Sequence, residues 1–266
     1  MSEPGAVATG SYTQLDFAIR SLPLPVLTHA TSCCELSLNE LVMKKTEVLQ
    51  TIRDVGVIPV VRASSAEEAI HVVEAIKAGG LPILEITMTV PGAVKVIEQL
   101  VKRFGEEAIV GAGSVLDSDS ARACIRAGAQ FIVSPALNLE TIACCHDLDL
   151  AVIPGALTPT EIVLAWNAGA DLVKVFPAGA MGGASYIKSL KAPLPQIELV
   201  PTGGVTLANV ASFIEAGAGA VGVGTDLVDN RAIRSGHPEK ITQAARAFIE
   251  AVRQARIVEA GKSAAN

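Results

Sequence analysis

Short runs of apolar, mostly β-branched residues recur along the chain from Val57 onward, each followed by a turn and a stretch of mixed polarity. Continuous apolar runs are typical of strands buried on both faces of a parallel sheet, whereas half-exposed strands alternate. The pattern predicts eight strands, at residues 57–62, 83–88, 109–115, 131–137, 150–156, 172–178, 197–203 and 220–225. The stretches between these strands are predicted to be helices.

Glycines and capping residues mark the ends of the predicted helices. Four helices lead into the next strand through similar text, KAGG, RAGA, NAGA and EAGA, at residues 77–80, 126–129, 167–170 and 215–218. Glycine ends a helix at little cost because it accepts the left-handed conformation. The segment from Thr158 to Glu161 indicates a helix start, with Thr as cap and Pro at the first helical position. Eight such units predict an α/β fold, a (β/α)8 TIM barrel in a single domain.

A doubly wound dinucleotide-binding sheet is the alternative fold. It would need a G-x-G-x-x-G turn directly after its first strand. The match at Gly217 to Gly222 instead follows a predicted helix and precedes a strand. We therefore interpret it as a helix stop and the start of a strand.

The two ends of the chain differ from this repeating pattern. Residues 1–42 have no strand–helix pattern, and Met43-Lys44-Lys45 resembles a translation start. We expect a disordered or non-native N-terminal extension at 1–42, with a cleaved transit peptide as the alternative, then a barrel domain at 43–260 and a disordered tail at 261–266.

Composition narrows the classes of function. The chain is half hydrophobic and only 3% aromatic, and its net charge of −6 comes with no basic cluster. Nucleic-acid binding is therefore not expected, and no apolar stretch is long enough to span a membrane. The five cysteines are an odd number without C-x-x-C spacing, which favours a reduced, cytoplasmic protein over a disulfide framework or a zinc site. No histidine falls at a strand end, so we expect no catalytic metal. We also expect no organic cofactor.

Polar residues gather at the carboxyl ends of the predicted strands, where such barrels carry their active sites. They are Arg62, Glu85, Thr87, Ser114, Lys174, Thr202 and Thr225. Polar groups on apolar strands are costly unless they pair or serve a site.

Lys174 interrupts the strand Leu172 to Phe176 and is the sharpest of these signals. Burial disfavours the charged form of an amine, and a neutral amine can attack a ketone and form an imine. Lys174 could alternatively be a structural lysine paired with Glu85. Glu85 itself is expected to be a general acid/base, a counter-ion, or both. Arg62 suits a substrate carboxylate, with a structural salt bridge as the alternative.

Two glycine-rich loops follow the last two strands, and they predict a phosphate site. Gly203 and Gly204 end the seventh strand, while Gly224 and Thr225 end the eighth. Backbone N–H groups in such turns bind phosphate, and barrels of this kind often place phosphate there.

The chain resembles the 2-keto-3-deoxy-6-phosphogluconate (KDPG) aldolase family, which includes 4-hydroxy-2-oxoglutarate aldolase activity. The resemblance covers about residue 45 to the last helix, through GVIPVVRASS, LEITMTVPGA, IVGAGSVL, FIVSPAL, IPGALTPTE, LVKVFPAG, VPTGGV and AVGVGTDLV.

The resemblance implies a class I aldolase of the Entner–Doudoroff pathway. It would cleave the phosphorylated 2-keto acid to pyruvate and glyceraldehyde 3-phosphate, and it would be a homotrimer. Lys174 would form the Schiff base with Glu85 as acid/base, and Pro135, Phe176 and Ser114 (a position that is usually Thr) would lie around the pyruvoyl group. Thr87 and Thr202 would also contact the substrate.

Two positions bear on specificity. Many relatives have Arg where this chain has Thr89, and here Arg62 would supply the charge from the neighbouring strand. Thr202 before Gly203 is typical of the phosphogluconate type, with the phosphogalactonate type as the alternative. Two alternatives to an aldolase remain. One is a phosphate-binding isomerase or synthase without a Schiff base, and the other is a non-catalytic barrel.

Overall fold

Every predicted strand segment contains a strand in the computed structural model, which describes residues 43–264. The strands are β1 Val57–Val61, β2 Ile83–Thr87, β3 Ile109–Gly113, β4 Phe131–Val133, β5 Ala151–Ile153, β6 Gly155–Ala156, β7 Val173–Val175, β8 Leu199–Pro201 and β9 Val221–Val223. The expected extension at 1–42 lies outside the described residues.

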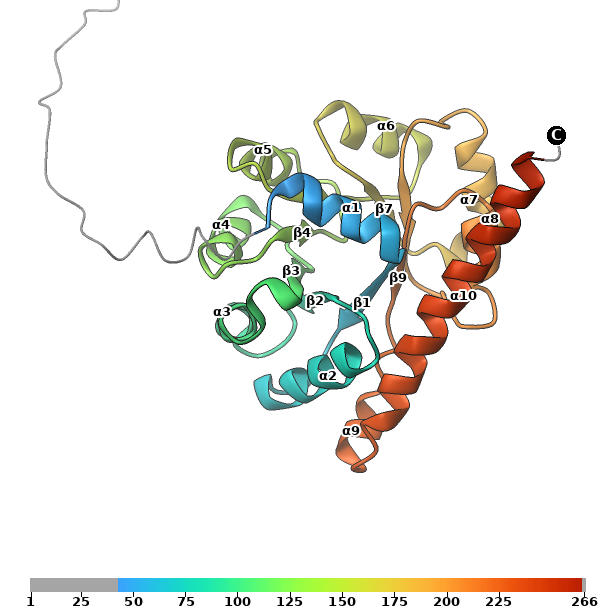
Figure 1. Ribbon diagram of the computed structural model, residues 1–266. Coiled ribbons are helices and arrows are strands. Elements are labelled where there is room, and N and C mark those ends of the chain that lie inside the picture. The colour runs from blue at the N-terminus through green and yellow to red at the C-terminus, as the bar shows by residue number, and fades with distance from the viewer. Residues whose placement is uncertain (1–42, 265–266) are drawn as a thin grey trace, which may run out of the picture. The chain divides into compact units, whose positions relative to one another are not determined.

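All strand pairs are parallel, and the strands form a curled arrangement (Figure 1). Six strands pair in the order β5-β4-β3-β2-β1-β9, and three more in the order β6-β7-β8. Only Pro154 separates β5 from β6, and a parallel bridge between Thr202 and Gly222 connects the β8 and β9 regions. The segment predicted as one strand at 150–156 is therefore two strands, because proline has no N–H to donate to the ladder.

Helices cover the outer face of the curled sheet (Figure 1). They are α1 Lys45–Val55, α2 Ala66–Ala78, α3 Ala93–Phe104, α4 Ser118–Arg126, α5 Leu139–Asp147, α6 Pro159–Asn167, α7 Ala184–Lys191, α8 Val210–Glu215, α9 Asn230–Arg234 and α10 Glu239–Ala264, with short 3-10 turns at Gly105–Glu107 and Gly179–Met181. The expected capping box at Thr158 is confirmed, with the side chains of Thr158 and Glu161 binding each other's backbone N–H groups.

Helix α1 lies at the end of the sheet where the strands begin. Its Lys45 forms an ion pair with Asp171, which precedes β7, at 2.9 Å. Arg53 binds Glu198, which precedes β8, through both carboxylate oxygens at distances from 2.8 to 3.0 Å. These ties leave the opposite end, where the strands finish, for the polar residues of the predicted site.

The expected disordered tail at 261–266 is wrong for its first four residues. Helix α10 is 26 residues long and continues to Ala264. Alanine and lysine favour helix, and one glycine inside a helix costs only about 1 kcal/mol, so Gly261 does not end it. Residues 265–266 lie outside the described part.

The core is formed by the strands and by the inner faces of the helices. Three cysteines on α4 and α5, namely Cys124, Cys144 and Cys145, are free and buried in it. Burial raises the pKa of Cys124 to about 11, and burial and the neighbouring Cys144 raise that of Cys145 to about 12. These thiols therefore act as small apolar groups.

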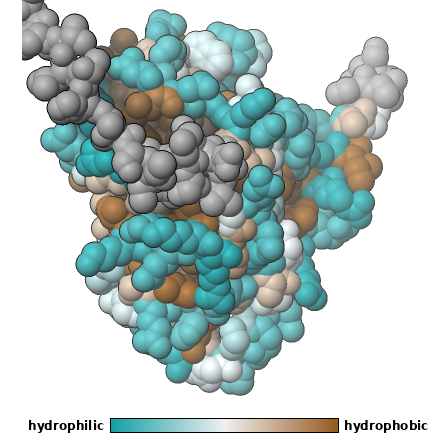
Figure 2. Space-filling model, turned by 60° about the vertical axis from the view of Figure 1, so that its left-hand side comes forward, coloured by the Kyte–Doolittle hydropathy of each residue, from teal (hydrophilic) through white to brown (hydrophobic). Residues whose placement is uncertain are grey.

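The molecular surface mixes the two kinds of side chain. Figure 2 shows hydrophobic patches separated by hydrophilic side chains, and the large exposed apolar residues include Leu116, Leu139, Leu164 and Ile257. Within the described residues, no helix is long and apolar enough to cross a membrane.

Candidate active site

The inward face of the curled sheet carries two of the polar residues predicted from the sequence, Glu85 and Lys174. Glu85 on β2 lies beside Val60 of β1 and Gly111 of β3 in the strand register. Lys174 on β7 lies beside Gly155 of β6 and Val200 of β8. Side chains alternate along a strand, so these two residues point inward while their neighbours pack against the helices.

Lys174 is a buried amine. The residue is 4% exposed, and its backbone N–H donates a hydrogen bond to the carbonyl of Pro154 at 2.9 Å. The Nζ atom lies 5.6 Å from the centre of the Phe176 ring. Phe176 directly follows β7, and its aromatic ring shields one side of the Lys174 amine.

Glu85 is a buried carboxyl group that is 2% exposed. Burial raises its pKa above the ordinary value, and the positive charges of Lys174 and Arg62 only partly oppose that rise. Its Oε1 atom is buried without a hydrogen-bond partner among the described residues. A buried carboxyl group with a raised pKa and an unpaired oxygen is suited to exchange a proton with a substrate.

A cavity of about 280 Å³ opens where β1, β7, β8 and β9 end. Its lining contains Val60, Arg62, Phe176, Thr202, Gly203, Gly204, Val205, Thr206, Gly224, Thr225 and Asp226. It thus brings together Arg62, Phe176, Thr202 and both glycine loops, as the sequence predicts. Among the described residues, Glu85 and Lys174 are not part of this lining.

A larger hollow of about 550 Å³ lies elsewhere, on the outer surface between α2 and the start of α10. Its polar lining residues are His71, Glu74, Glu239 and Thr242, and it contains none of the polar strand-end residues. Its size therefore does not make it the better candidate for chemistry. Within residues 43–264, no group of three or more His, Cys, Asp or Glu side chains could hold a metal ion.

Thr87, Ser114 and Pro135 also lie outside the cavity lining. The Thr87 hydroxyl donates to the carbonyl of Val61 at 2.9 Å and lies 2.7 Å from the hydroxyl of Thr89. Thr87 therefore supports the end of β1, directly before Arg62. Ser114 follows β3 with a φ of 57°, a left-handed conformation that residues other than glycine rarely adopt.

The glycine loop at Gly203 and Gly204 is held by hydrogen bonds from outside it. The N–H of Gly179 donates to the carbonyl of Gly203 at 2.8 Å, and Asn209 Nδ2 donates to the carbonyl of Gly204 at 2.9 Å. Gly203 and Gly204 have φ values of 87° and 78°, which only glycine adopts without strain. The backbone N–H groups of this loop therefore keep a fixed orientation at the cavity.

Three strand glycines make room for residues of the site, a role that the sequence did not predict for any of them. A Cβ on Gly113 would lie 2.0 Å from Glu85 Oε1, and one on Gly222 would lie 2.2 Å from Thr202 Oγ1. A Cβ on Gly155 would lie 2.3 Å from the backbone of Pro135. Glycine inside a buried strand often marks a place where another part of the protein approaches closely. The sequence therefore contained a sign of close approach, but it did not show which residue approaches each glycine.

Replacing Gly113 by alanine is expected to displace the Glu85 carboxyl group and to lower kcat/KM about 100-fold, because an error of about 1 Å in a catalytic group costs that much. Steady-state kinetics measures the loss. Gly261→Ala is the matched control, since nothing lies within 4 Å of a Cβ there and its activity should be unchanged. Full activity in Gly113→Ala would contradict the placement of Glu85 at the reacting centre.

Comparison with known proteins gives a consistent result. The family model for KDPG and KHG aldolases matches residues 48–244. The 2-dehydro-3-deoxy-6-phosphogalactonate aldolase of Escherichia coli K12 is 38% identical over 200 residues, which are 74% of this chain and 95% of that enzyme.

Two solved structures extend the comparison to three dimensions. The KDPG aldolase of Legionella pneumophila, with pyruvate captured as a covalent carbinolamine, is 30% identical with a TM-score of 0.69, covering 75% of this chain and 97% of that one. A porous protein cage, designed by fusing symmetric oligomeric domains, is 35% identical with a TM-score of 0.71, covering 78% of this chain and 76% of that one.

Proposed function

This chain belongs to the KDPG and KHG aldolase family and is a class I aldolase, a carbon–carbon lyase, and we propose that Lys174 is its Schiff-base residue and Glu85 its general acid/base. The observation that carries this assignment is the burial of both groups on the inward face of the sheet, where Lys174 is 4% exposed and Glu85 is 2% exposed. The two groups are close enough for the charge of Lys174 to lower the pKa of Glu85, against the larger effect of burial.

The proposed reaction begins when the Lys174 amine adds to C2 of the 2-keto acid. Loss of water from this carbinolamine leaves a protonated imine. Glu85 then takes the proton of the C4 hydroxyl, directly or through water, and the C3–C4 bond breaks. Its electron pair passes into the iminium to form an enamine, and the aldehyde leaves.

The second half of the reaction returns the enzyme to its starting state. C3 of the enamine is reprotonated, and water hydrolyses the imine to release pyruvate and the free amine. Glu85 is suited to both proton steps because its raised pKa lies nearer the working pH than that of an exposed glutamate. This scheme uses no metal or organic cofactor.

Reduction with borohydride tests the proposal. In the presence of saturating pyruvate, the reduced adduct should map by peptide mass spectrometry to Lys174. Lys188, exposed on α7, is the internal control and should remain unmodified. Adduct formation at another lysine, or at none, would contradict the assignment of Lys174.

We assign the two ends of the substrate to two parts of the cavity. Arg62 binds the carboxylate, and the loops at Gly203–Gly204 and Gly224–Thr225 bind the phosphate. The shared lining of one cavity supports this arrangement. We further assign contacts with the pyruvoyl end to Phe176, Thr87, Ser114, Pro135 and Thr202.

The preferred substrate in this proposal is the phosphogluconate-derived keto acid, with cleavage of 4-hydroxy-2-oxoglutarate as a second reaction. Thr202, whose residue type before Gly203 is typical of the phosphogluconate type, lines the cavity and supports this choice. The identity of 38% with a phosphogalactonate aldolase favours the epimer as the second candidate. Cleavage rates of the two phosphorylated keto acids, measured side by side, discriminate between them.

Replacing Arg62 by alanine is expected to raise the KM for the keto acid by about 10- to 100-fold, as expected when a charge-assisted contact worth roughly 1.5–3 kcal/mol is lost. Thr89→Ala is the matched control. The Thr89 hydroxyl forms a hydrogen bond with Thr87 and carries no charge for the carboxylate. The KM of Thr89→Ala should therefore change less than about twofold. Equal small effects in the two variants would remove Arg62 from carboxylate binding.

We also infer that residues 43–264 form one closed (β/α)8 barrel, supported by the bridge between Thr202 and Gly222 and by the single residue between β5 and β6. We propose a homotrimer in the cytoplasm. Exposed apolar side chains and the similarity to a cage built from symmetric oligomers support assembly. Sedimentation velocity measures the number of subunits.

A further inference from the structure

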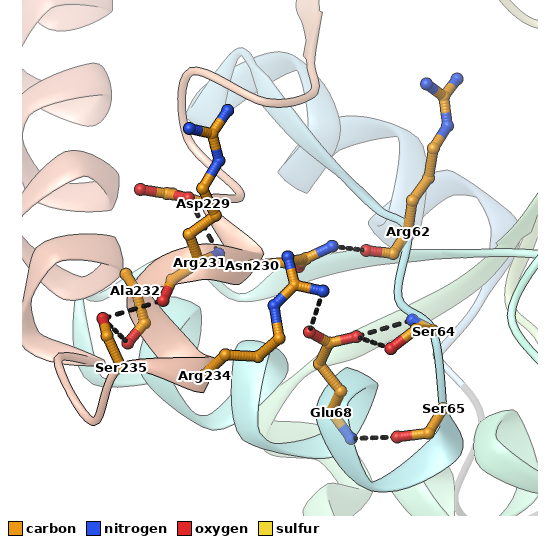
Figure 3. Close-up of polar contacts among 10 residues, drawn as sticks. All are labelled: Arg62, Ser64, Ser65, Glu68, Asp229, Asn230, Arg231, Ala232, Arg234 and Ser235. Carbon is orange, nitrogen blue, oxygen red and sulfur yellow. Dashed lines mark hydrogen bonds and ion pairs between the residues drawn. The ribbon is translucent and has the colours of Figure 1, made fainter.

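Arg62 is held in place through its backbone rather than through its side chain. It directly follows β1, and its guanidinium donates no hydrogen bond to another described residue. Figure 3 shows the Arg62 side chain extending away from the polar network below it. Because no side-chain hydrogen bond to a described residue fixes the guanidinium, the backbone conformation at Arg62 sets the range of directions that this side chain can take (Figure 3).

The carbonyl of Arg62 accepts a hydrogen bond from Asn230 Nδ2 at 2.6 Å. Asn230 is the first residue of α9, the helix that comes five residues after Thr225. The bond therefore links the loop beside the predicted phosphate site to the residue predicted to bind the carboxylate (Figure 3).

Glu68 on α2 holds the residues that follow Arg62. Its Oε2 accepts hydrogen bonds from the Ser64 N–H at 2.6 Å and from the Ser64 hydroxyl at 2.7 Å. Its own N–H donates to Ser65 Oγ at 3.1 Å. The Glu68 side chain is 8% exposed, so this is a buried anchor and not a surface contact.

Helix α9 also contacts this anchor. Arg234, at the end of α9, lies 3.6 Å from Glu68 through its Nη1 atom. Burial raises the pKa of Glu68, but the hydrogen bonds from Ser64 and the charge of Arg234 outweigh it and leave the pKa below the ordinary value. Glu68 is therefore an ionised group that ties together α2, α9 and the loop at residues 62–65.

We propose that Asn230, Glu68 and Arg234 form a positioning clamp that sets the direction of Arg62 and thereby the affinity for the keto-acid carboxylate. The inference rests on the proposed function. Without the clamp, the loop at 62–65 samples other conformations, and the apparent affinity falls in proportion to the time that Arg62 spends in the binding direction. The imine chemistry on Lys174 does not involve these residues.

Asn230→Ala is expected to raise the KM for the phosphorylated keto acid about fivefold while kcat changes less than twofold, as expected if Arg62 keeps its binding direction roughly a fifth of the time. Arg234→Gln should act in the same direction with a smaller effect. The matched controls are Asn167→Ala at the exposed end of α6, and Arg253→Gln, which breaks an exposed ion pair with Glu250 on α10. Both controls should leave KM unchanged.

A double-mutant cycle separates positioning from a general structural role. If Asn230 acts through Arg62, then Asn230→Ala should have no further effect on KM in the Arg62→Ala background. An equal rise of KM in both backgrounds would overturn the clamp. Amide hydrogen exchange offers a second measurement, in which residues 62–65 should exchange faster in Asn230→Ala than in the parent protein. Unchanged exchange there would also overturn it.

The cycle distinguishes failure of the clamp from failure of the proposed function. A normal KM in Asn230→Ala, together with a raised KM in Arg62→Ala, overturns the clamp and leaves the role of Arg62 standing. A normal KM in Arg62→Ala removes Arg62 from carboxylate binding and overturns the clamp with it. Borohydride trapping on Lys174 reports on the Schiff base independently of both results.

Discussion

Replacing Lys174 by methionine should abolish aldolase activity, with a fall in kcat of roughly 10⁴- to 10⁶-fold, as when a covalent nucleophile is removed from other enzymes. Methionine has a similar length and fills irregular buried space, so the fold should survive. Steady-state cleavage of the phosphorylated keto acid measures the loss, and borohydride with pyruvate should no longer label the protein.

The fold and the surface provide controls for this variant. Removal of a buried amine also removes the cost of burying it, so the melting temperature should not fall. Lys188→Met, on the exposed face of α7, should retain full activity. Substantial turnover by Lys174→Met would exclude a Schiff base at this position and would favour an aldolase that forms its imine elsewhere.

Replacing Glu85 by glutamine is expected to lower kcat about 10²- to 10⁴-fold, the usual range for loss of a general acid/base. Glutamine keeps the shape of the side chain but cannot exchange a proton with the substrate. Trapping of pyruvate on Lys174 should persist at a reduced rate, because the amine is unchanged. Kinetics and borohydride labelling together measure this division of roles.

The raised pKa of Glu85 fixes the sign of two pH effects. Activity that needs the carboxylate form falls as the pH drops through this pKa, so the acidic limb of kcat/KM should lie above that of an ordinary glutamate. The charge of Arg62 lowers the pKa of Glu85, so Arg62→Ala should move this limb to still higher pH. A limb that stays in place would remove Glu85 as the group that titrates.

The same shift affects stability in the opposite sense from a salt-bridged carboxylate. Between the unfolded pKa and the raised folded pKa, the folded state binds more protons, so the free energy of unfolding decreases as the pH rises. Glu85 thus costs stability at neutral pH, and Glu85→Gln should melt at a higher temperature than the parent protein. A lower melting temperature at neutral pH would contradict the burial of an ionisable group at this place.

The geometry around Glu85 gives a functional reason for this loss of stability. Its Oε1 atom has no hydrogen-bond partner among the described residues, and Gly113 leaves open the space into which it points. A buried acceptor without a partner costs roughly 1–3 kcal/mol. An unpaired buried acceptor of this kind is typical of a site in which the missing partner is a substrate or a water molecule.

Much of this protein could be predicted from local patterns. Continuous apolar runs located every strand, and the cap at Thr158 located the start of α6, because period and capping act over a few neighbouring residues. Lys174 and Glu85 were identifiable because a charged residue inside an apolar run has no solvent to face, whatever the fold around it. Local patterns failed at Gly261, where a single glycine did not end α10.

Only the tertiary structure decided which distant residues meet. The strand register sets Gly113 against Glu85 and Gly222 against Thr202, and a shift of one residue would turn these side chains to the opposite face. Folding of the chain brings Asn230 to the carbonyl of Arg62, 168 residues away. No sequence pattern encodes that contact, since it depends on how the sheet curls and on where α9 packs against α2.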